Sequence, residues 1–362
     1  MDKYLKSNWW MFLVIIFLIS RIIMYYQFNI ANAVILHDHG TFSSAMCKWD
    51  CKWYLTIINS GYDEHIRATP HIWRGLANWA FFPLYPNLVA LASKLTTLDA
   101  VTAGILLNQL LVFIAAIYFY RLLRLSFNDL NSRFGAILLI FSPFSVYFAS
   151  LYTEGLFLVL SIAGFYYLKT NRGVTAAILG GLLSATRPVG VMLIVPIIVN
   201  YLRRKKTLTQ LALALSLAVS GLFCYMLFLY FRTGDALAFQ HIQKAWGRNG
   251  WDLQHLDHQL WSMLSDWHNS IIFILSLLLS VYLLFKKFYE EACFNLACIL
   301  PGAITGTMMS EGRFCGNLFT FYFALVVVAQ RSWTVKIVFF FFSVVLYMSY
   351  YIYWVGHANF LI

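Results

Sequence analysis

The stretch "NWWMFLVIIFLISRIIMYYQF", residues 8–28, contains a single charged side chain, Arg21, in a run long enough to cross a bilayer. A transmembrane helix needs about 20 predominantly apolar residues. Two lysines precede the run, as in a signal peptide, but no small-residue cleavage site follows it. We therefore expect a retained first transmembrane helix, with Arg21 paired to an acid inside a helix bundle.

Similar apolar runs recur along almost the whole chain, which is 61% hydrophobic and only 11% charged. Soluble domains carry about 25% charged residues. The runs are continuous and not alternating, which favours helices over a barrel. The pattern predicts an all-α polytopic membrane protein with one membrane domain, residues 1–362. The net charge of +11 is assigned to membrane flanks that attract anionic lipids, because no nucleic-acid module is present.

Basic clusters predict the topology, since lysine and arginine concentrate at the cytoplasmic ends of membrane helices. The clusters, such as "RRKK" at residues 203–206, fall at every second boundary between apolar runs. They predict an inner amino terminus, an outer carboxyl terminus and about eleven spans. The predicted spans are 9–28, 102–123, 133–149, 152–169, 173–186, 188–201, 208–231, 269–286, 291–309, 316–331 and 334–355.

Three regions on the predicted outer side collect most of the unusual polarity: loop 29–101, loop 232–268 and turn 308–317. Function is therefore expected on the outer face. Within the first loop, residues 79–97 are predicted to form a helix that lies at the membrane interface. Cys47 and Cys51, in the same loop, either pair as a disulfide or serve as packing residues.

Four motifs then occur in order: "KWDCKWYLTIINSGY" (48–62), "WAFFPLYP" (79–86), "SPFSVYFASLYTEGLFLVLSIAG" (142–164) and "GLLSATRPVG" (181–190). Over residues 40–200 they resemble the PIG-V family, which comprises the second mannosyltransferase of GPI-anchor synthesis and prokaryotic relatives. That family belongs to the GT-C class. The resemblance implies a GT-C-type helical bundle with a catalytic module (1–205), variable carboxyl-terminal helices (206–362), and inverting transfer from a polyprenyl- or dolichyl-phosphate-linked sugar.

Asp50 is the predicted catalytic residue. An acceptor hydroxyl that attacks the anomeric carbon must lose its proton, and a carboxylate within hydrogen-bond reach serves as general base. Trp49, Trp53 and Tyr54 are side chains that favour the membrane surface, where a lipid phosphate would lie, and they are expected to contact substrate. The alternative is that Asp50 only caps a helix.

Two further acids are candidates for substrate binding. Asp38, in "HDHG", could be a second acid, an acceptor-binding group or, with its flanking histidines, part of a metal site. Adjacent residues rarely converge on one ion, so no metal site is predicted. Glu154 lies where a span enters from the outer side, and a charged group at membrane depth is costly unless it is paired. Its alternative role is to stabilise the helix amino terminus.

Two arginines are predicted to bind the donor phosphate. Arg187, in "SATRPVG", lies far from the basic clusters, and its guanidinium can form two hydrogen bonds to a phosphate. The alternative is a side chain that only extends to the interface. Arg313, in "SEGRF", is the second cation on the outer side, with a local pair to Glu311 as its alternative.

The sequence therefore predicts an inverting glycosyltransferase, by resemblance a mannosyltransferase. Its partners would be a polyprenyl- or dolichyl-phosphate-linked sugar, a lipid- or protein-linked acceptor and membrane lipids, with no cofactor assigned and divalent-metal dependence open. The other hypotheses are a secondary transporter or lipid flippase, which would show internal repeats, and a non-catalytic membrane subunit. The membrane is predicted to be the bacterial inner membrane, with the endoplasmic reticulum as the alternative.

Overall fold

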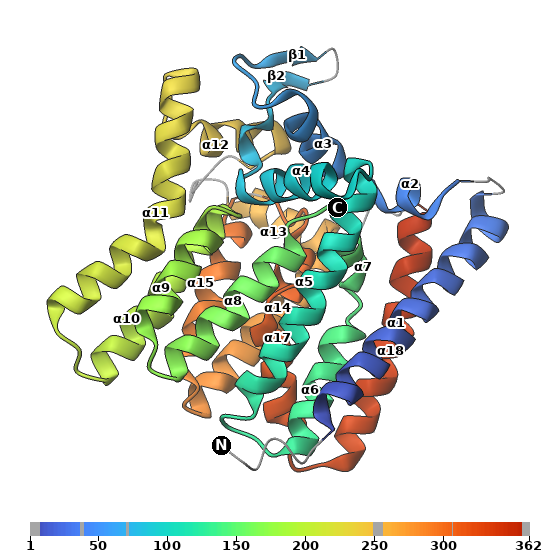
Figure 1. Ribbon diagram of the computed structural model, residues 1–362, viewed down its shortest axis with the longest axis vertical. Coiled ribbons are helices and arrows are strands. Elements are labelled where there is room, and N and C mark those ends of the chain that lie inside the picture. The colour runs from blue at the N-terminus through green and yellow to red at the C-terminus, as the bar shows by residue number, and fades with distance from the viewer. Residues whose placement is uncertain (1–7, 37–39, 70–71, 249–255, 306, 357–362) are drawn as a thin grey trace.

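The computed structural model describes residues 8–36, 40–69, 72–248, 256–305 and 307–356. Within these residues, five helices are long and apolar enough to cross a bilayer. They are α1 (Trp9–Ala31), α5 (Ala100–Leu123), α11 (Leu208–Thr233), α14 (Trp267–Phe285) and α18 (Trp333–Val355). Figure 1 shows these helices running between two ends of the molecule, with α1 and α18 side by side.

Each of the five long helices coincides with a predicted span. The other six predicted spans coincide with helices of 10–16 residues. These helices are α6 (Asp129–Ile140), α8 (Glu154–Lys169), α9 (Gly173–Ser184), α10 (Ile194–Arg203), α15 (Tyr289–Ala303) and α17 (Phe319–Ala329). The helical bundle predicted from the sequence is confirmed, whereas the number of eleven crossings stays a prediction.

Breaks in the helices explain why several are short. The segment "FSPF" divides predicted span 133–149 into α6 and α7 (Ser145–Ala149), and a 3₁₀ turn, η3 (Pro188–Leu193), precedes α10. The Phe144 amide donates to Ser142 Oγ at 3.0 Å, which satisfies a backbone group freed by the first break. Non-helical backbone is tolerated at membrane depth only when protein surrounds it. Both Ser142 and Phe144 are buried.

One end of the bundle, hereafter the Asp50 end, is covered by short elements. They are η1 (Asn32–Leu36), α2 (Phe42–Met46), α3 (Cys51–Ser60), a hairpin of β1 (Arg67–Thr69) and β2 (Ile72–Leu76), η2 (Asn78–Ala80), α4 (Leu84–Thr96), α12 (Ala238–His241), η4 (Ile242–Trp246), α13 (Leu256–Ser265) and α16 (Glu311–Gly316). In Figure 1, α4 lies across the ends of the long helices. This placement agrees with the interfacial helix predicted for residues 79–97.

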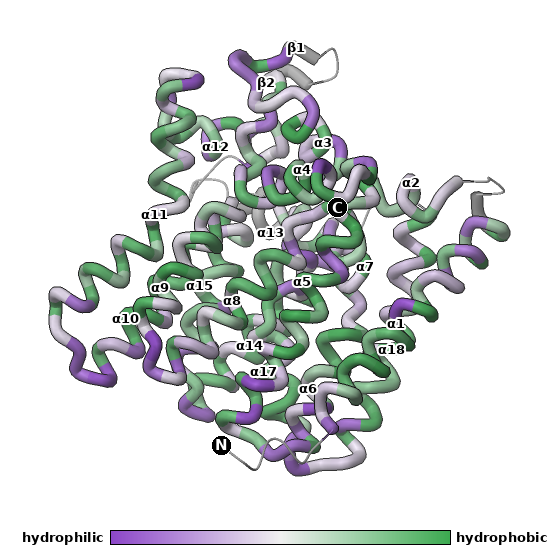
Figure 2. The backbone as a smooth tube through the Cα atoms, in the orientation of Figure 1, coloured by the Kyte–Doolittle hydropathy of each residue, from purple (hydrophilic) through white to green (hydrophobic). Residues whose placement is uncertain are grey.

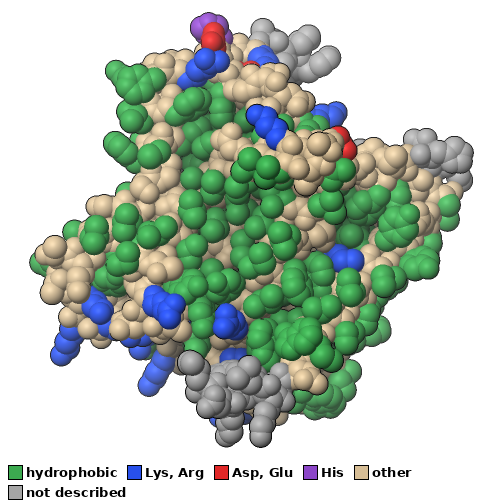
Figure 3. All heavy atoms as spheres, in the orientation of Figure 1, with side chains coloured by type: hydrophobic (Ala, Val, Ile, Leu, Met, Phe, Trp, Pro, Cys, Tyr) green, Lys and Arg blue, Asp and Glu red, His purple; other side chains and the backbone are tan. Residues whose placement is uncertain are grey.

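Polarity separates along the bundle. Figure 2 shows apolar backbone through the middle of the molecule and hydrophilic segments at the ends, and Figure 3 shows lysine and arginine side chains at both ends, with a group of them opposite the Asp50 end. In the interior, nearly every residue of α8 is buried. Helices α9 and α11 approach closely because small residues face each other: a Cβ on Gly221 would lie 2.0 Å from Gly181 O.

Candidate active site

The turn that carries Asp50 is held by three contacts. Cys47 and Cys51 form a disulfide, so the pairing left open by the sequence is resolved. Tyr152 Oη donates to Lys48 O at 3.0 Å and accepts from Asp50 N at 3.2 Å. Lys48 Nζ donates to Trp354 O and Val355 O at 2.7 and 2.8 Å, at the end of α18. The turn is thereby attached to the end of α18 and to the segment between α7 and α8.

Asp50 lies at the first residue before α3, but its side chain makes no capping hydrogen bond to that helix. Its carboxylate instead accepts from Arg313 Nη1, which lies 2.9 Å from Oδ2. The Asp50 side chain is 26% exposed, whereas Arg313 is 9% exposed. The helix-cap alternative is therefore not supported, and a partly accessible carboxylate is held in place by a buried cation.

Glu154 continues this arrangement towards the interior. Its side chain is 1% exposed at the start of α8, and Oε1 lies 3.1 Å from Arg187 Nη1 and 3.5 Å from Arg313 Nε. Four residues proposed from sequence thus form one row of ion pairs with alternating charge, Asp50–Arg313–Glu154–Arg187. The local pair proposed for Arg313 with Glu311 is wrong, because the ion-pair partners of Arg313 are Asp50 and Glu154.

A third arginine joins the cluster around the Phe314 ring. The guanidinium carbons of Arg187, Arg248 and Arg313 lie 4.9, 5.1 and 5.1 Å from the centre of that ring. Arg248 Nη2 donates to Met309 O at 3.1 Å, while Arg248 Nε is buried without a hydrogen-bond partner among the described residues. Burial lowers the pKa of Arg248 to about 10, which leaves it charged at neutral pH.

The sequence did not single out Arg248 for function. It lies in loop 232–268 among other charged residues, and no motif distinguishes it from them. The only available signal was an arginine on the predicted outer side, the same reason that favoured Arg313.

Glu311 is the third acid of the cluster. It is 1% exposed, and Cys315 Sγ lies 3.7 Å from its Oε1. Burial raises the pKa of Glu311 to about 7, although the charge of Arg248 opposes this shift. Among the described residues, the cluster thus combines three arginines with Asp50, Glu154 and an acid, Glu311, whose pKa lies near neutrality.

The aromatic residues near Asp50 pack inside the protein. Trp53 stacks on Phe81 with ring centres 5.7 Å apart, and Trp49 makes an edge contact with Trp354 at 4.8 Å. Tyr54 is 6% exposed and lies against Tyr85. These contacts give all three a structural role, and substrate contact by Trp49, Trp53 or Tyr54 stays a prediction.

Two other expectations have different outcomes. Asp38 lies outside the described residues, and within the described residues no group of three metal-ligating side chains occurs. No acid of the described segments pairs with Arg21: Arg21 Nη1 donates to Met24 Sδ at 3.9 Å, and the guanidinium lies 4.5 Å from the Phe17 ring centre. The first helix contains no acid, and the neighbouring α18 contributes tyrosines at this position, so aromatic contacts replace the predicted ion pair.

The fold is similar to that of the oligosaccharyltransferase of Archaeoglobus fulgidus. In its apo form that structure has a TM-score of 0.50 and 12% identity, and the match covers 97% of this chain and 57% of the other. The same enzyme in complex with zinc and sulfate gives a TM-score of 0.46 at 14% identity, covering 94% of this chain and 53% of the other. This chain thus spans little more than half the length of those neighbours. The likeness shows that this chain shares the helical-bundle fold of that membrane enzyme.

A family model adds the second step of the identification. The model described as mannosyltransferase (PIG-V) matches residues 27–289. The chain therefore belongs to the PIG-V mannosyltransferase family, as the four motifs predicted. The match includes Asp50, Glu154, Arg187 and Arg248, whereas Arg313 lies beyond its end. A search among curated proteins finds no match.

Proposed function

We propose that this membrane glycosyltransferase moves mannose, with inversion, from a polyprenyl- or dolichyl-phosphate-linked donor to a lipid- or protein-linked acceptor. The reaction would take place at the Asp50 end, on the outer face of the bacterial inner membrane. The endoplasmic reticulum is the alternative membrane. Family membership supports an enzyme over the transporter and the non-catalytic subunit.

The observation that carries the proposal is the hydrogen bonding of the Asp50 carboxylate, which leaves one oxygen available. Arg313 binds Oδ2, and within the described part of the chain Oδ1 accepts no hydrogen bond. Arg313 holds the Asp50 carboxylate in place, and a carboxylate is the group that can accept a proton from the acceptor hydroxyl. Oδ1 would take the proton of the acceptor hydroxyl as its oxygen attacks the anomeric carbon. In-line attack opposite the phosphate inverts that carbon.

The arginines would stabilise the leaving phosphate. As the bond from the sugar to the phosphate oxygen breaks, negative charge develops on the leaving phosphate. Arg187 and Arg248 each have further donor groups beyond their protein contacts, and both surround Phe314 within the same cluster. Glu154 would position Arg187 and Arg313 and does not itself need to touch substrate.

Purified protein should transfer mannose from polyprenyl-phosphate-mannose to a panel of glycolipid and peptide acceptors. The product should carry the anomeric configuration opposite to that of the donor. GDP-mannose, offered in parallel, should support no transfer, because the proposed donor carries its sugar on a lipid phosphate. Transfer from GDP-mannose alone, or retention of configuration, would contradict the proposal.

Arg187→Lys should lower turnover by roughly 10- to 100-fold, the loss expected when a charge-assisted hydrogen bond worth about 1.5–3 kcal/mol is removed. Lysine keeps the charge beside Glu154 but cannot form two parallel bonds to a phosphate. Steady-state kinetics with varied donor would measure the change. Arg204→Lys, at an exposed site on the opposite end, is the matched control. Unchanged kinetics in Arg187→Lys would limit Arg187 to pairing with Glu154.

A further inference from the structure

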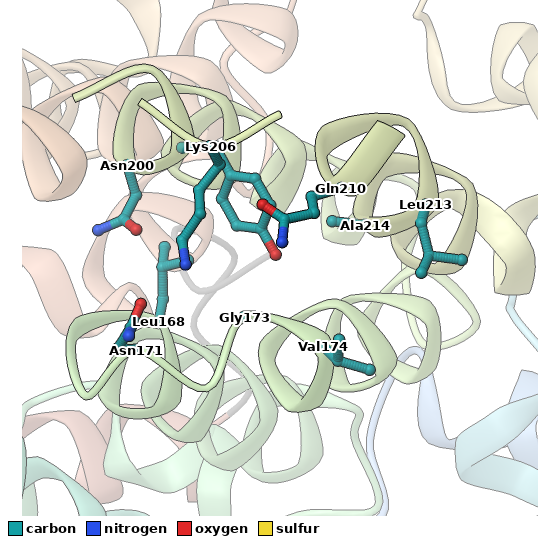
Figure 4. Close-up of a pocket in the computed structure, with 10 residues that line it drawn as sticks. Leu168, Asn171, Gly173, Val174, Asn200, Lys206, Gln210, Leu213 and Ala214 are labelled. Carbon is teal, nitrogen blue, oxygen red and sulfur yellow. The ribbon is translucent and has the colours of Figure 1, made fainter. Parts of the chain in front are cut away.

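A second polar cluster lies at the end of the bundle opposite Asp50. There, a pocket of about 160 Å³ lies between the end of α8, the start of α9, the end of α10 and the start of α11. Figure 4 shows Lys206 and Gln210 reaching from one rim into the space above Asn171 and Val174. The pocket is separate from the arginine cluster and contributes nothing to the reaction proposed above.

Three polar side chains that line this pocket have no hydrogen-bond or ion-pair partner among the described residues: Asn200, Tyr201 and Lys206. Asn200 and Tyr201 are 5% and 6% exposed as whole residues, but their side-chain polar atoms are accessible from the pocket. Two hydrogen-bonding groups and one cation are therefore available to the same ligand.

The available groups favour an anion. Lys206 and the Asn200 amide donate hydrogen bonds, and the Tyr201 hydroxyl can donate as well. The Thr207 amide donates to Gln210 Oε1 at 3.3 Å, so the remaining Gln210 Nε2 group is a donor too. No acidic residue lines the pocket. Arg172, Arg204 and Lys205 add positive charge at the same end, while the buried acids Glu290 and Glu291 are paired with Arg203 and Lys169.

The surroundings and size of the pocket favour a lipid headgroup. Val174 and Leu213, each 54% exposed, line it beside the apolar belt of the bundle. Its volume is well below the roughly 300–1,000 Å³ of sites that enclose a whole small molecule. A phosphate could therefore enter while acyl chains remain along the outer surface of α9 and α11. We propose that this pocket binds the phosphate headgroup of an anionic phospholipid.

The test is lipid binding by the purified, delipidated protein, measured by native mass spectrometry. Phosphatidylglycerol should bind in preference to phosphatidylcholine with the same acyl chains. Lys206→Gln should weaken phosphatidylglycerol binding about fivefold or more, the effect of one basic residue on an anionic lipid. Lys205→Gln is the matched control, because Lys205 is exposed, adjacent in sequence and outside the pocket lining. Equal weakening in both variants would indicate general surface charge and overturn the proposal.

Two further measurements test the pocket and the nature of its ligand. Tyr201→Phe removes only a hydroxyl that has no protein partner, so it should weaken phosphatidylglycerol binding without lowering the unfolding temperature. Unchanged binding in Tyr201→Phe would overturn the proposed pocket. Millimolar inorganic phosphate should not displace the lipid, because it lacks acyl chains. Full displacement would assign the pocket to free phosphate instead of a phospholipid.

Discussion

We expect Asp50→Asn to abolish sugar transfer, while the protein keeps its fold and its affinity for the donor. The substitution preserves the shape of the side chain and removes its ability to accept a proton. General-base catalysis is typically worth about 10²–10⁴-fold in rate, so turnover should fall to about 1% or less. Initial rates with labelled polyprenyl-phosphate-mannose, together with donor binding by the same preparation, would measure the two effects separately.

Asp99→Asn is the matched control for this experiment. Asp99 caps α5 by accepting hydrogen bonds from Val101 N and Thr102 N, and asparagine is an equally good helix cap. The same chemical change should therefore leave turnover and stability unaltered at position 99. Wild-type turnover in Asp50→Asn would remove Asp50 from the catalytic role.

Arg313→Met should have the largest combined effect on stability and activity. Arg313 is 9% exposed and pairs with both Asp50 and Glu154, and Glu154 is 1% exposed. Removing one member of a buried ion pair costs about 3–5 kcal/mol, because its partner stays buried without compensation. The variant should unfold at a lower temperature and lose measurable transfer.

A double variant separates these two roles of Arg313. In Arg313→Met with Glu154→Gln, the buried acid is neutralised as well, so part of the lost stability should return. Activity should not return, since Asp50 still lacks the cation that binds Oδ2. Thermal unfolding and transfer assays on both variants provide the comparison. An Arg313→Met protein that unfolds like wild type would show that the ion pairs contribute little.

The fold class and family followed from local features of the sequence. Apolar runs such as residues 8–28 specify membrane helices because each run satisfies its backbone hydrogen bonds within itself, whatever its neighbours are. Four motifs, read in order, were enough to predict the family that the match over residues 27–289 then showed. The same local reasoning placed Asp50 next to tryptophans on the expected outer side.

Contacts between distant segments could not be read in this way. Asp50 and Arg313 were each proposed, but their hydrogen bond joins residues 263 positions apart, and the only ionic partner that the sequence suggested for Arg313 was the local Glu311, as an alternative to phosphate binding. Arg248 was passed over because nothing in its own segment distinguishes it. The break at "FSPF" divides predicted span 133–149 into two helices, and the 3₁₀ turn before α10 shortens the helix within predicted span 188–201.

What the sequence determined by itself is therefore the class of the protein, the positions of its apolar helices and the candidate residues at one end. What only the tertiary structure decided is which candidates meet: the row of ion pairs Asp50–Arg313–Glu154–Arg187, the three arginines around Phe314 and the Cys47–Cys51 disulfide. The physical reason is the range of the forces involved. Helix formation depends on neighbours within a few residues, whereas a buried charge is stable only beside a partner that packing brings from elsewhere in the chain.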